Sequence, residues 1–292
     1  MDKVKKLMEQ LEGNLEELFE SEKYTRWLTT LSKFHRYSFY NTILIASQQP
    51  DASYVAGFQA WKKKFNRHVK KGEKAIKILA PIIRQTDEVK KDELGRPVLD
   101  KNGQPILEER LIGYRIVSVF DISQTEGEEL PALSSQDFLD CGVEGYQKLF
   151  SALEQASPVT VRFEEVNDGS HGYFSRSKQE IVLKKGMSQA DTLATLFHEM
   201  AHASLHNNEE AKEVDRHIKE VEAESVAYVL STHFGLPCEE VSLAYIAGWA
   251  SADKDKMGIL KNSMSRIRGA ASRLLTEIEK ELKKSESSQM IA

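Results

Sequence analysis

The stretch "TLFHEMAHASLH", residues 195–206, contains the pattern His-Glu-x-x-His between positions 198 and 202. On an α-helix, residues four apart lie one turn apart on the same face, so His198 and His202 can hold one metal ion. Glu199 stands beside them, placed to accept a proton from a water molecule that the ion activates. The pattern is typical of zinc-dependent hydrolases. We therefore predict Zn²⁺ as the cofactor, although other divalent ions accept the same ligands.

The surrounding sequence gives this motif a suitable structural context. The segment 171–185 alternates like a β-hairpin, and Ser188, followed by Asp191 three residues on, resembles the capping box that starts a helix. A second long helix is predicted from about residue 213 to Gly235, with Pro237 just beyond it. A hairpin, a capped helix with the motif and a glutamate-bearing helix together make coincidence the weaker explanation.

The third ligand that a catalytic zinc site needs must come from elsewhere in the chain, and zincins with a short motif often recruit a glutamate from the next helix. Three glutamates compete for this role: Glu220, Glu222 and Glu224. We choose Glu224, because the small neighbours Ala223 and Ser225 would let the two helices approach closely. Glu220, one turn earlier on the same face, is the substitute, and a merely solvated acid is the competing interpretation of Glu224.

Further polar residues near the motif have weaker assignments. His206 continues the stripe of His198 and His202 and is a candidate for a group that supports a ligand. Tyr228 and His217 are both candidates for stabilising an oxyanion, and nothing in the sequence selects between them. An ordinary structural role is the default expectation for His206, His217 and His233.

The composition places limits on the class of protein. With 292 residues the chain has room for two domains, and 40% hydrophobic with 29% charged residues fits a globular chain rather than a disordered one. No apolar run is long enough to cross a bilayer, and the charged N-terminus has no apolar signal core. The two cysteines, Cys141 and Cys238, are far apart and indicate free thiols. We expect a cytoplasmic protein without a membrane partner; the oligomeric state is left open.

Charge divides unevenly along the chain. Residues 24–84 contain twelve Lys or Arg against two acids, a net charge of +10, whereas residues 186–240 contain three against eleven acids, a net charge of −8. This asymmetry predicts two modules with different partners. We expect an α+β fold: an N-terminal α+β nucleic-acid-binding domain over 1–126, a linker over 127–143, and a mainly helical, zincin-like metallopeptidase domain with a small β-hairpin or sheet over 144–285. A flexible tail is expected over 286–292.

Within the first module, helical periodicity is predicted to stop at Pro50. A strand is expected near 75–83 and another over 114–120, with a hairpin turn at Asn102-Gly103.

The basic first module also contains ten aromatic residues between positions 24 and 65. Cations follow a phosphate backbone and aromatic rings stack on unpaired bases, which is the chemistry of single-strand binding. The candidate cations are Arg36, Lys62, Lys63, Lys64, Arg67, Lys70, Lys71 and Lys74. The alternative is that most of the rings form a core and the lysines are simply solvated.

Several motifs resemble the ArdC-type antirestriction proteins of conjugative plasmids and transposons. The segments "NTILIASQQP", "VAGFQAWKKKFNRHVKKGEKAIKILAP" and "VFDISQTEG" look like that family's N-terminal, single-stranded-DNA-binding domain. The segments "LFHEMAHASLH", "EAESVAYVL" and "YIAGWA" look like its C-terminal zincin-like domain, which is also similar to the ImmA/IrrE zincins. The N-terminal pattern is matched by Asn41, Gln49, Trp61, Arg67, Lys71 and Gly72, and the metallopeptidase pattern by His198, Glu199, His202 and Glu224.

The resemblance implies a protein of a mobile element that protects incoming DNA from the host's restriction enzymes. Its implied partners are single-stranded DNA and a host protein or peptide substrate. Two alternatives stay open. One is an ImmA-like regulatory metalloprotease that cleaves a repressor or host protein, and the other is a pure single-strand-binding protein whose metal is structural.

Overall fold

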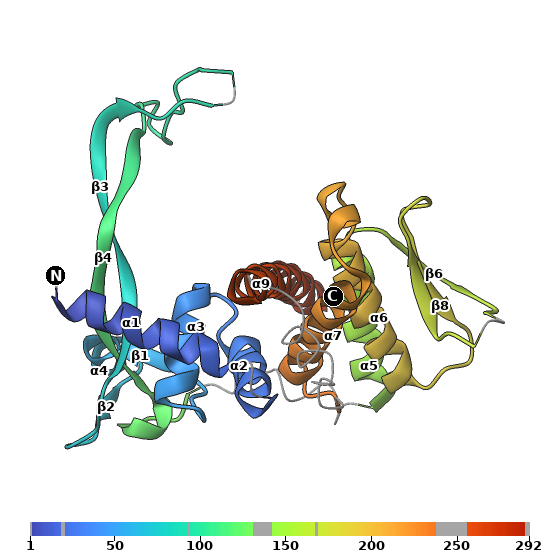
Figure 1. The fold of residues 1–292 in the computed structure, drawn as a ribbon, viewed down its shortest axis with the longest axis horizontal. Coiled ribbons are helices and arrows are strands. Elements are labelled where there is room, and N and C mark those ends of the chain that lie inside the picture. Colours follow the sequence, from blue (N-terminus) through green and yellow to red (C-terminus); the bar gives the residue numbers. More distant parts are fainter. Residues whose placement is uncertain are drawn as a thin grey trace.

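The computed structural model describes residues 2–18, 21–92, 94–130, 142–166, 169–237 and 256–289. It has the expected α+β character, with helices gathered in the middle of the molecule and sheets towards its two sides (Figure 1). Both cysteines lie outside the described residues, as does most of the predicted linker. None of the described helices is long and apolar enough to span a bilayer.

The chain begins with three helices: α1 (Asp2–Glu17), α2 (Ser21–Lys33) and α3 (Phe39–Gln48). α1 is amphipathic, because Leu7, Leu11 and Leu15 are all buried. The Ser38 side chain caps α3 by accepting the backbone N–H of Asn41. The helix ends at Gln48, two residues before Pro50, as the sequence predicts.

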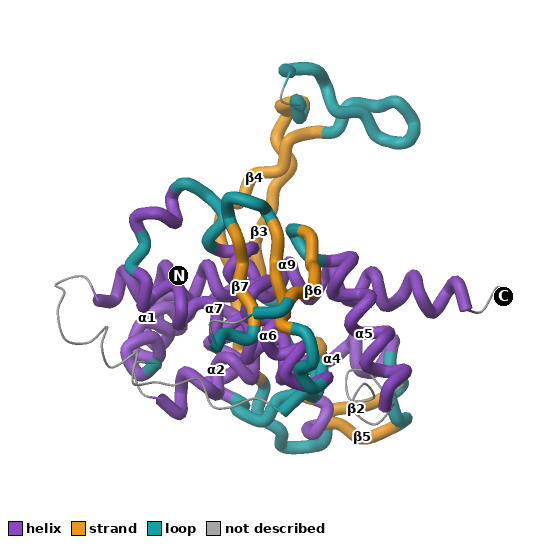
Figure 2. The backbone as a smooth tube through the Cα atoms, turned by 90° about the vertical axis from the view of Figure 1, so that its right-hand side faces the viewer, coloured by secondary structure: helices purple, strands orange, loops and turns teal. Residues whose placement is uncertain are grey.

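The rest of the first module is built around a long antiparallel ribbon, β3 (Ile76–Val89) and β4 (Leu107–Asp121). β1 (Val55–Gly57) pairs with β4, α4 (Phe58–Lys64) follows it, and β2 (Arg67–Val69) pairs with β5 (Thr125–Gly127) after the 3₁₀ turn η1 (Ile122–Gln124). The predicted turn at Asn102-Gly103 is confirmed, since Gly103 has φ +76° and donates to the Asp100 carbonyl. Both strands of the ribbon are longer than predicted from their apolar runs. The additional residues are exposed, and this part of the ribbon extends beyond the helices (Figures 1 and 2).

The second half combines a small sheet with helices. β6 (Thr160–Glu164) runs parallel to β8 (Glu180–Lys184), and β7 (Gly172–Ser175) pairs antiparallel with β8 on its other side, which confirms the predicted hairpin. The helices are α5 (Gly142–Ala156), α6 (Gln189–Leu205), α7 (Arg216–His233) and α9 (Lys256–Gln289), with a 3₁₀ turn η2 (Glu210–Glu213) before α7. The helix expected from about residue 213 begins at Arg216, because Asp215 caps it by accepting the His217 backbone N–H.

One hydrophobic core crosses the predicted domain boundary. It joins Leu11 of α1 and Trp27 of α2 to Phe197 of α6 and Leu230 of α7. Polar contacts follow the same route: the Tyr24 hydroxyl lies 2.8 Å from Ser225 Oγ, between α2 and α7. The first two helices therefore pack with the second half of the chain, so packing does not follow the division into two sequence segments.

A helix enters the segment where a tail is expected, residues 286–292. Helix α9 continues to Gln289, and only residues 290–292 lie outside the described part of the chain. Ion pairs three residues apart, Lys280 with Glu277 and Lys284 with Glu281, support a polar helix that hydrophobic periodicity alone does not reveal.

Candidate metal centre

Two histidines of α6 and one glutamate of α7 converge on a single point. Ser188 caps α6 by accepting the Asp191 backbone N–H at 3.1 Å, which confirms the predicted start of the helix. From this helix His198 and His202 bring their Nε2 atoms to 3.0 Å from each other. Glu220 Oε2 lies 3.6 Å from His198 Nε2 and 3.4 Å from His202 Nε2. The three residues form one of two groups in the described chain that could hold a metal ion.

These distances fit a divalent ion. Ligand atoms bound at about 2.0–2.1 Å to a tetrahedral ion lie about 3.3–3.4 Å apart, close to the separations measured here. Two imidazoles and one carboxylate are also a donor set that Zn²⁺ and related ions accept, with one position left for water or substrate. The protein itself therefore supplies three ligands at a suitable spacing.

The structure brings Glu220 rather than Glu224 into this group. The small residues that favoured Glu224 serve another contact, because Ser225 lies against Tyr24 of α2. Glu224 remains nearby: one of its carboxylate oxygens is buried without a hydrogen-bond partner among the described residues. Burial raises the pKa of Glu224 above its ordinary value, although His198 acts in the opposite direction. The substitute ligand, Glu220, is thus the better geometric choice.

Glu199 occupies the position expected of a general base. Its side chain is buried, and the backbone N–H of Phe174 in β7 donates to its carboxylate. Burial raises the pKa of Glu199 above its ordinary value, while His198 and His202 lower it in part. A carboxylate whose pKa is raised towards neutrality accepts and returns protons more readily in catalysis.

β7 brings the outer edge of the described sheet to this base. It is the outer strand of the sheet in the order β6-β8-β7, and it packs against α6. Gly172 makes the close approach feasible, because a Cβ atom there would lie 2.7 Å from the Val182 carbonyl oxygen and 2.9 Å from Thr195 Cγ2. An extended peptide can add to such an edge by backbone hydrogen bonds.

A chain of hydrogen bonds behind His202 fixes which of its ring nitrogens faces the centre. Glu222 is fully buried, and hydrogen bonds from His206, Arg266 and Ser263 hold its pKa below the ordinary value despite burial, so it is an ionised acceptor. His206 Nε2 therefore donates to Glu222 Oε2 at 3.1 Å. Burial lowers the pKa of His206, so this ring is neutral and its Nδ1 accepts from His202 Nδ1 at 3.0 Å. His202 Nε2 is left with a lone pair directed at the centre.

This chain of hydrogen bonds was only partly predictable from the sequence. The spacing of the histidine stripe indicated His206, and Glu222 was among the candidate ligands. Arg266 and Ser263 had no signal, because α9 lies more than forty residues further along the chain than Glu222. The oxyanion-stabilising group stays unassigned, since the Tyr228 hydroxyl lies 3.1 Å from Thr29 Oγ1.

Three of the predicted nucleic-acid contacts make structural contacts within the first module. Trp61 is fully buried and donates from Nε1 to the Phe120 carbonyl at 2.9 Å. The side chain of Asn41, also buried, bonds both the N–H and the carbonyl of Leu79. The Arg67 guanidinium bonds the Thr125 side chain and nearby carbonyls, which joins β2 to β5. Their side chains are committed to these contacts.

The remaining predicted residues lie at the surface. Gln49, Lys71, Gly72 and Lys74 line an open groove of about 660 Å³ together with Gln48 and Gln124. Lys62, Lys63 and Lys64 are exposed in the last turn of α4, and exposed Lys70 bonds the Ser123 carbonyl. Arg36 is exposed but pairs with Glu279. Among the aromatic residues, Tyr24, Trp27 and Phe34 are core, whereas Tyr40 and Phe58 are exposed.

Comparisons with known proteins add a family relationship. An uncharacterized protein of Bacillus anthracis, pXO2-81, is 28% identical, with 86% of this chain and 47% of that protein covered, so the chain spans about half the length of this curated relative. Crystal structures of the antirestriction ArdC protein from plasmid R388 also match. The metal-free structure is 20% identical, covers 84% of this chain and 86% of that chain, and has a TM-score of 0.49. The Mn(II)-bound structure is 19% identical, covers 83% of this chain and 89% of that chain, and has a TM-score of 0.46. Residues 1–120 match the family model described as the N-terminal domain of anti-restriction factor ArdC. The N-terminal part of the chain is therefore similar to the N-terminal domain of anti-restriction factor ArdC.

Proposed function

We propose that this protein is an antirestriction factor of a mobile element that binds single-stranded DNA and carries a metal-dependent, peptidase-type centre. The observation that carries the proposal is the convergence of His198, His202 and Glu220 beside the buried Glu199. The matched family, an anti-restriction factor, supports protection of incoming DNA as the biological role.

The DNA-binding part of the proposal rests on the surface of the first module. Lys71 and Lys74 lie at an open groove whose walls also present the amide side chains of Gln48 and Gln49. Lysines attract the phosphate backbone, while the exposed rings of Tyr40 and Phe58 are available to stack on unpaired bases. This surface suits a strand without sequence-specific readout.

Fluorescence anisotropy with a labelled 30-nucleotide single strand and the matching duplex, across a salt series, tests this part. We expect tighter, salt-sensitive binding to the single strand, with a slope of about −0.7 per neutralised phosphate. Replacing Lys62, Lys63 and Lys64 together by Ala should weaken binding and flatten the slope. The matched control replaces three exposed lysines of α9, Lys280, Lys283 and Lys284, and should leave the slope unchanged. Equal slopes for both variants would remove α4 from the DNA site.

The hydrolytic part rests on the residues around the metal centre. A divalent ion held by the two histidines and Glu220 would supply Lewis-acid polarisation of a carbonyl and activation of water. Glu199 would take the proton from that water and return it to the leaving amine. The outer edge of β7 would hold an extended peptide beside Glu199, since β7 contacts α6 and donates to Glu199.

The variant Glu199→Gln tests this role, because the amide keeps the shape of the side chain but cannot accept the proton. We expect it to abolish peptidase activity while metal affinity and DNA affinity stay as in the parent protein. Cleavage of a library of unstructured peptides, followed by mass spectrometry, is the readout. Activity retained by the variant would exclude Glu199 as the base.

An ImmA-like regulatory protease is the second candidate, and the outer edge of β7 favours it, because a repressor segment could add there as a strand. Restriction protection in cells shows whether hydrolysis is needed for the effect. A protease of this kind should lose its effect with Glu199→Gln, whereas a pure single-strand-binding protein with a structural metal should keep full protection.

A further inference from the structure

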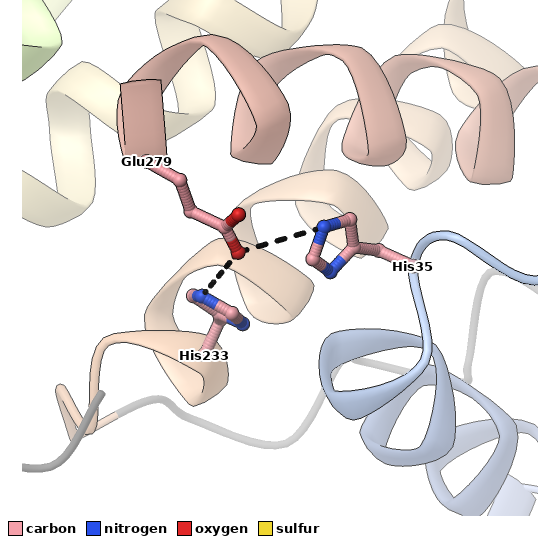
Figure 3. A group of neighbouring side chains, drawn as sticks. All are labelled: His35, His233 and Glu279. Atoms are coloured by element: carbon pink, nitrogen blue, oxygen red, sulfur yellow. Dashed lines mark ion pairs between the residues drawn. The ribbon is translucent and has the colours of Figure 1, made fainter. Parts of the chain in front are cut away.

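A second group of potential ligands lies away from the metal centre. His35 follows the end of α2, His233 is the last residue of α7, and Glu279 lies in the second half of α9. Figure 3 shows both rings turned towards one oxygen of the glutamate. The distances to Glu279 Oε1 are 3.6 Å from His35 Nε2 and 3.5 Å from His233 Nε2. All three ligand atoms lie within 4.8 Å of one another.

The protonation state of His233 can be derived from its other contact. Its Nδ1 lies 2.7 Å from the carbonyl oxygen of Ser32, which can only accept a hydrogen bond. Nδ1 therefore carries a proton, and in the neutral ring Nε2 presents a lone pair to the cluster. Metal-binding histidines are characteristically held in this way, with the second nitrogen donating to a carbonyl or carboxylate.

His35 has no such partner. Only 5% of the residue is exposed, and neither ring nitrogen makes a hydrogen bond within the described part of the chain. Burying an unpaired polar group costs free energy, so an unpaired imidazole aimed at a carboxylate indicates a missing partner. The 3.6 Å separation is too long for a hydrogen bond but close to the distance of about 3.3–3.4 Å between ligands of a tetrahedral ion.

The charges around the cluster favour an ion over protonated histidines. Arg36 Nη2 donates to Glu279 Oε2 at 2.6 Å, which already neutralises the carboxylate and turns Oε1 towards the rings. One carboxylate cannot also compensate two buried imidazolium groups. Arg268, which lies near His35, is committed to the Tyr37 carbonyl through two hydrogen bonds and does not compete for Glu279. Two neutral rings with one fixed carboxylate oxygen are a metal-binding set.

We propose that His35, His233 and Glu279 form a second divalent-metal site, which takes Zn²⁺ or an ion of similar preference and completes its coordination with water. The three ligands come from distant segments: His35 lies in the α2–α3 connection, His233 in α7 nearly 200 residues later, and Glu279 in α9 a further 46 residues along. An ion there ties the N-terminal helices to the second half of the chain. The site is structural, and its binding free energy adds to the stability of the folded protein.

The test uses the full chain with the first centre removed, as the variant His198→Ala/His202→Ala, and titrates it with Zn²⁺ or Co²⁺ alone. We expect one ion bound per chain, the visible absorption of four-coordinate Co²⁺, and a higher Tm when Zn²⁺ is present. Adding Glu279→Gln should abolish all three responses. The matched control Glu277→Gln, an exposed glutamate on the same helix that pairs with Lys280, should keep them.

Two results would overturn the proposal: a folded His198→Ala/His202→Ala protein that binds no ion, or Zn²⁺ binding that survives Glu279→Gln unchanged. Should the double variant fail to fold, metal content per chain decides instead. The parent protein then carries two ions and Glu279→Gln one; equal content in both excludes the second site. Because the first centre is absent or counted separately, this outcome is independent of the proposed peptidase function.

Discussion

At the scale of single residues, a buried carboxylate controls how the metal centre presents its ligands. Glu222 accepts from His206, which in turn accepts from His202, so the ring of His202 is held with Nε2 towards the centre. Arg266 balances the charge of Glu222 from α9. Orientation of a ligand through such a chain stabilises a bound ion without touching it.

Replacing Glu222 by Gln should therefore weaken metal binding. The amide presents a donor as well as an acceptor, so His206 and His202 lose their fixed tautomers, and we expect affinity to fall by about 10–100-fold. Zinc titration against a competing chelator measures this, with circular dichroism to verify folding. Glu213→Gln, at an exposed glutamate in η2, is the control. Unchanged metal affinity in a folded Glu222→Gln variant would show that the hydrogen bonds behind His202 do not support the metal centre.

Asp121 has a comparable structural role in the first module. Its buried carboxylate accepts the backbone N–H groups of Ser53 at 2.7 Å, Tyr54 at 3.0 Å and Ser123 at 2.9 Å. Burial acts to raise the pKa of Asp121, but these hydrogen bonds outweigh it and hold the pKa below the ordinary value. An ionised form stabilised by folding contributes stability above the unfolded pKa and loses it as pH falls through the folded pKa.

We predict that Asp121→Ala destabilises the protein by about 2–4 kcal/mol near neutral pH, because it leaves buried N–H groups unpaired. The loss should shrink as pH falls below about 4, because the carboxyl of the unfolded parent chain takes up a proton there before the folded one does. Urea unfolding at pH 7 and pH 3.5 measures both effects. The control Asp92→Ala removes similar bonds at an exposed turn and should change stability little. If the parent and Asp121→Ala differ in unfolding free energy by the same amount at both pH values, the ionised state assigned to Asp121 is contradicted.

At the scale of secondary-structure elements, the close contact of β7 with α6 positions the candidate base. Glu199 receives a hydrogen bond from the Phe174 backbone, and Gly172 lets the strand approach the helix. The geometry of the centre thus depends on a strand that contributes no ligand.

A methyl group at this glycine should displace the strand. Gly172→Ala would place Cβ 2.7 Å from the Val182 carbonyl oxygen, so we expect a loss of about 1–3 kcal/mol in stability and reduced activity at unchanged metal affinity. Gly13→Ala is the control, because its site in α1 is open and the change should stabilise the helix by up to about 1 kcal/mol. If Gly172→Ala leaves stability and activity unchanged, the contact between β7 and α6 is not close enough to exclude a methyl group.

The helices and the hairpins were predictable from sequence because their signals are local: the Ser188 cap, the His198–His202 spacing and the Asn102-Gly103 turn. The third ligand was not, because Glu220 and Glu224 share a helix face, and only the folded structure shows that Glu220 lies near both histidines. Trp61, named as a DNA contact through its match to the N-terminal pattern, is buried, and a motif does not reveal which of its rings face solvent. The cluster at His35 depends on three distant segments and gave no signal.

At the scale of the whole molecule, the first two helices belong to the packing of the second half. Trp27 of α2 shares a core with Leu230 of α7, and the cluster of His35, His233 and Glu279 lies along the same junction. The junction therefore couples the stability of the first module to that of the candidate metal centre.

This continuity predicts cooperative unfolding. Native-state hydrogen exchange should give the slowest amides of α2 and α7 the same free energy of opening, because neither helix can leave the shared core alone. The Tyr24→Phe variant, which removes the contact with Ser225, should lower both values together by about 0.5–1.5 kcal/mol. Two separate unfolding transitions would mean that the halves are independent.

The central claim concerns which residues hold an ion at the candidate metal centre, and the Zn²⁺ dissociation constants of Glu220→Gln and Glu224→Gln test it most directly. Both are measured in a Glu279→Gln background, so that the second site does not contribute. We predict that Glu220→Gln loses at least about 100-fold in affinity, more than the loss of a group that only orients a ligand, whereas Glu224→Gln changes it by less than about 10-fold. A large loss with Glu224→Gln and little with Glu220→Gln would contradict the account.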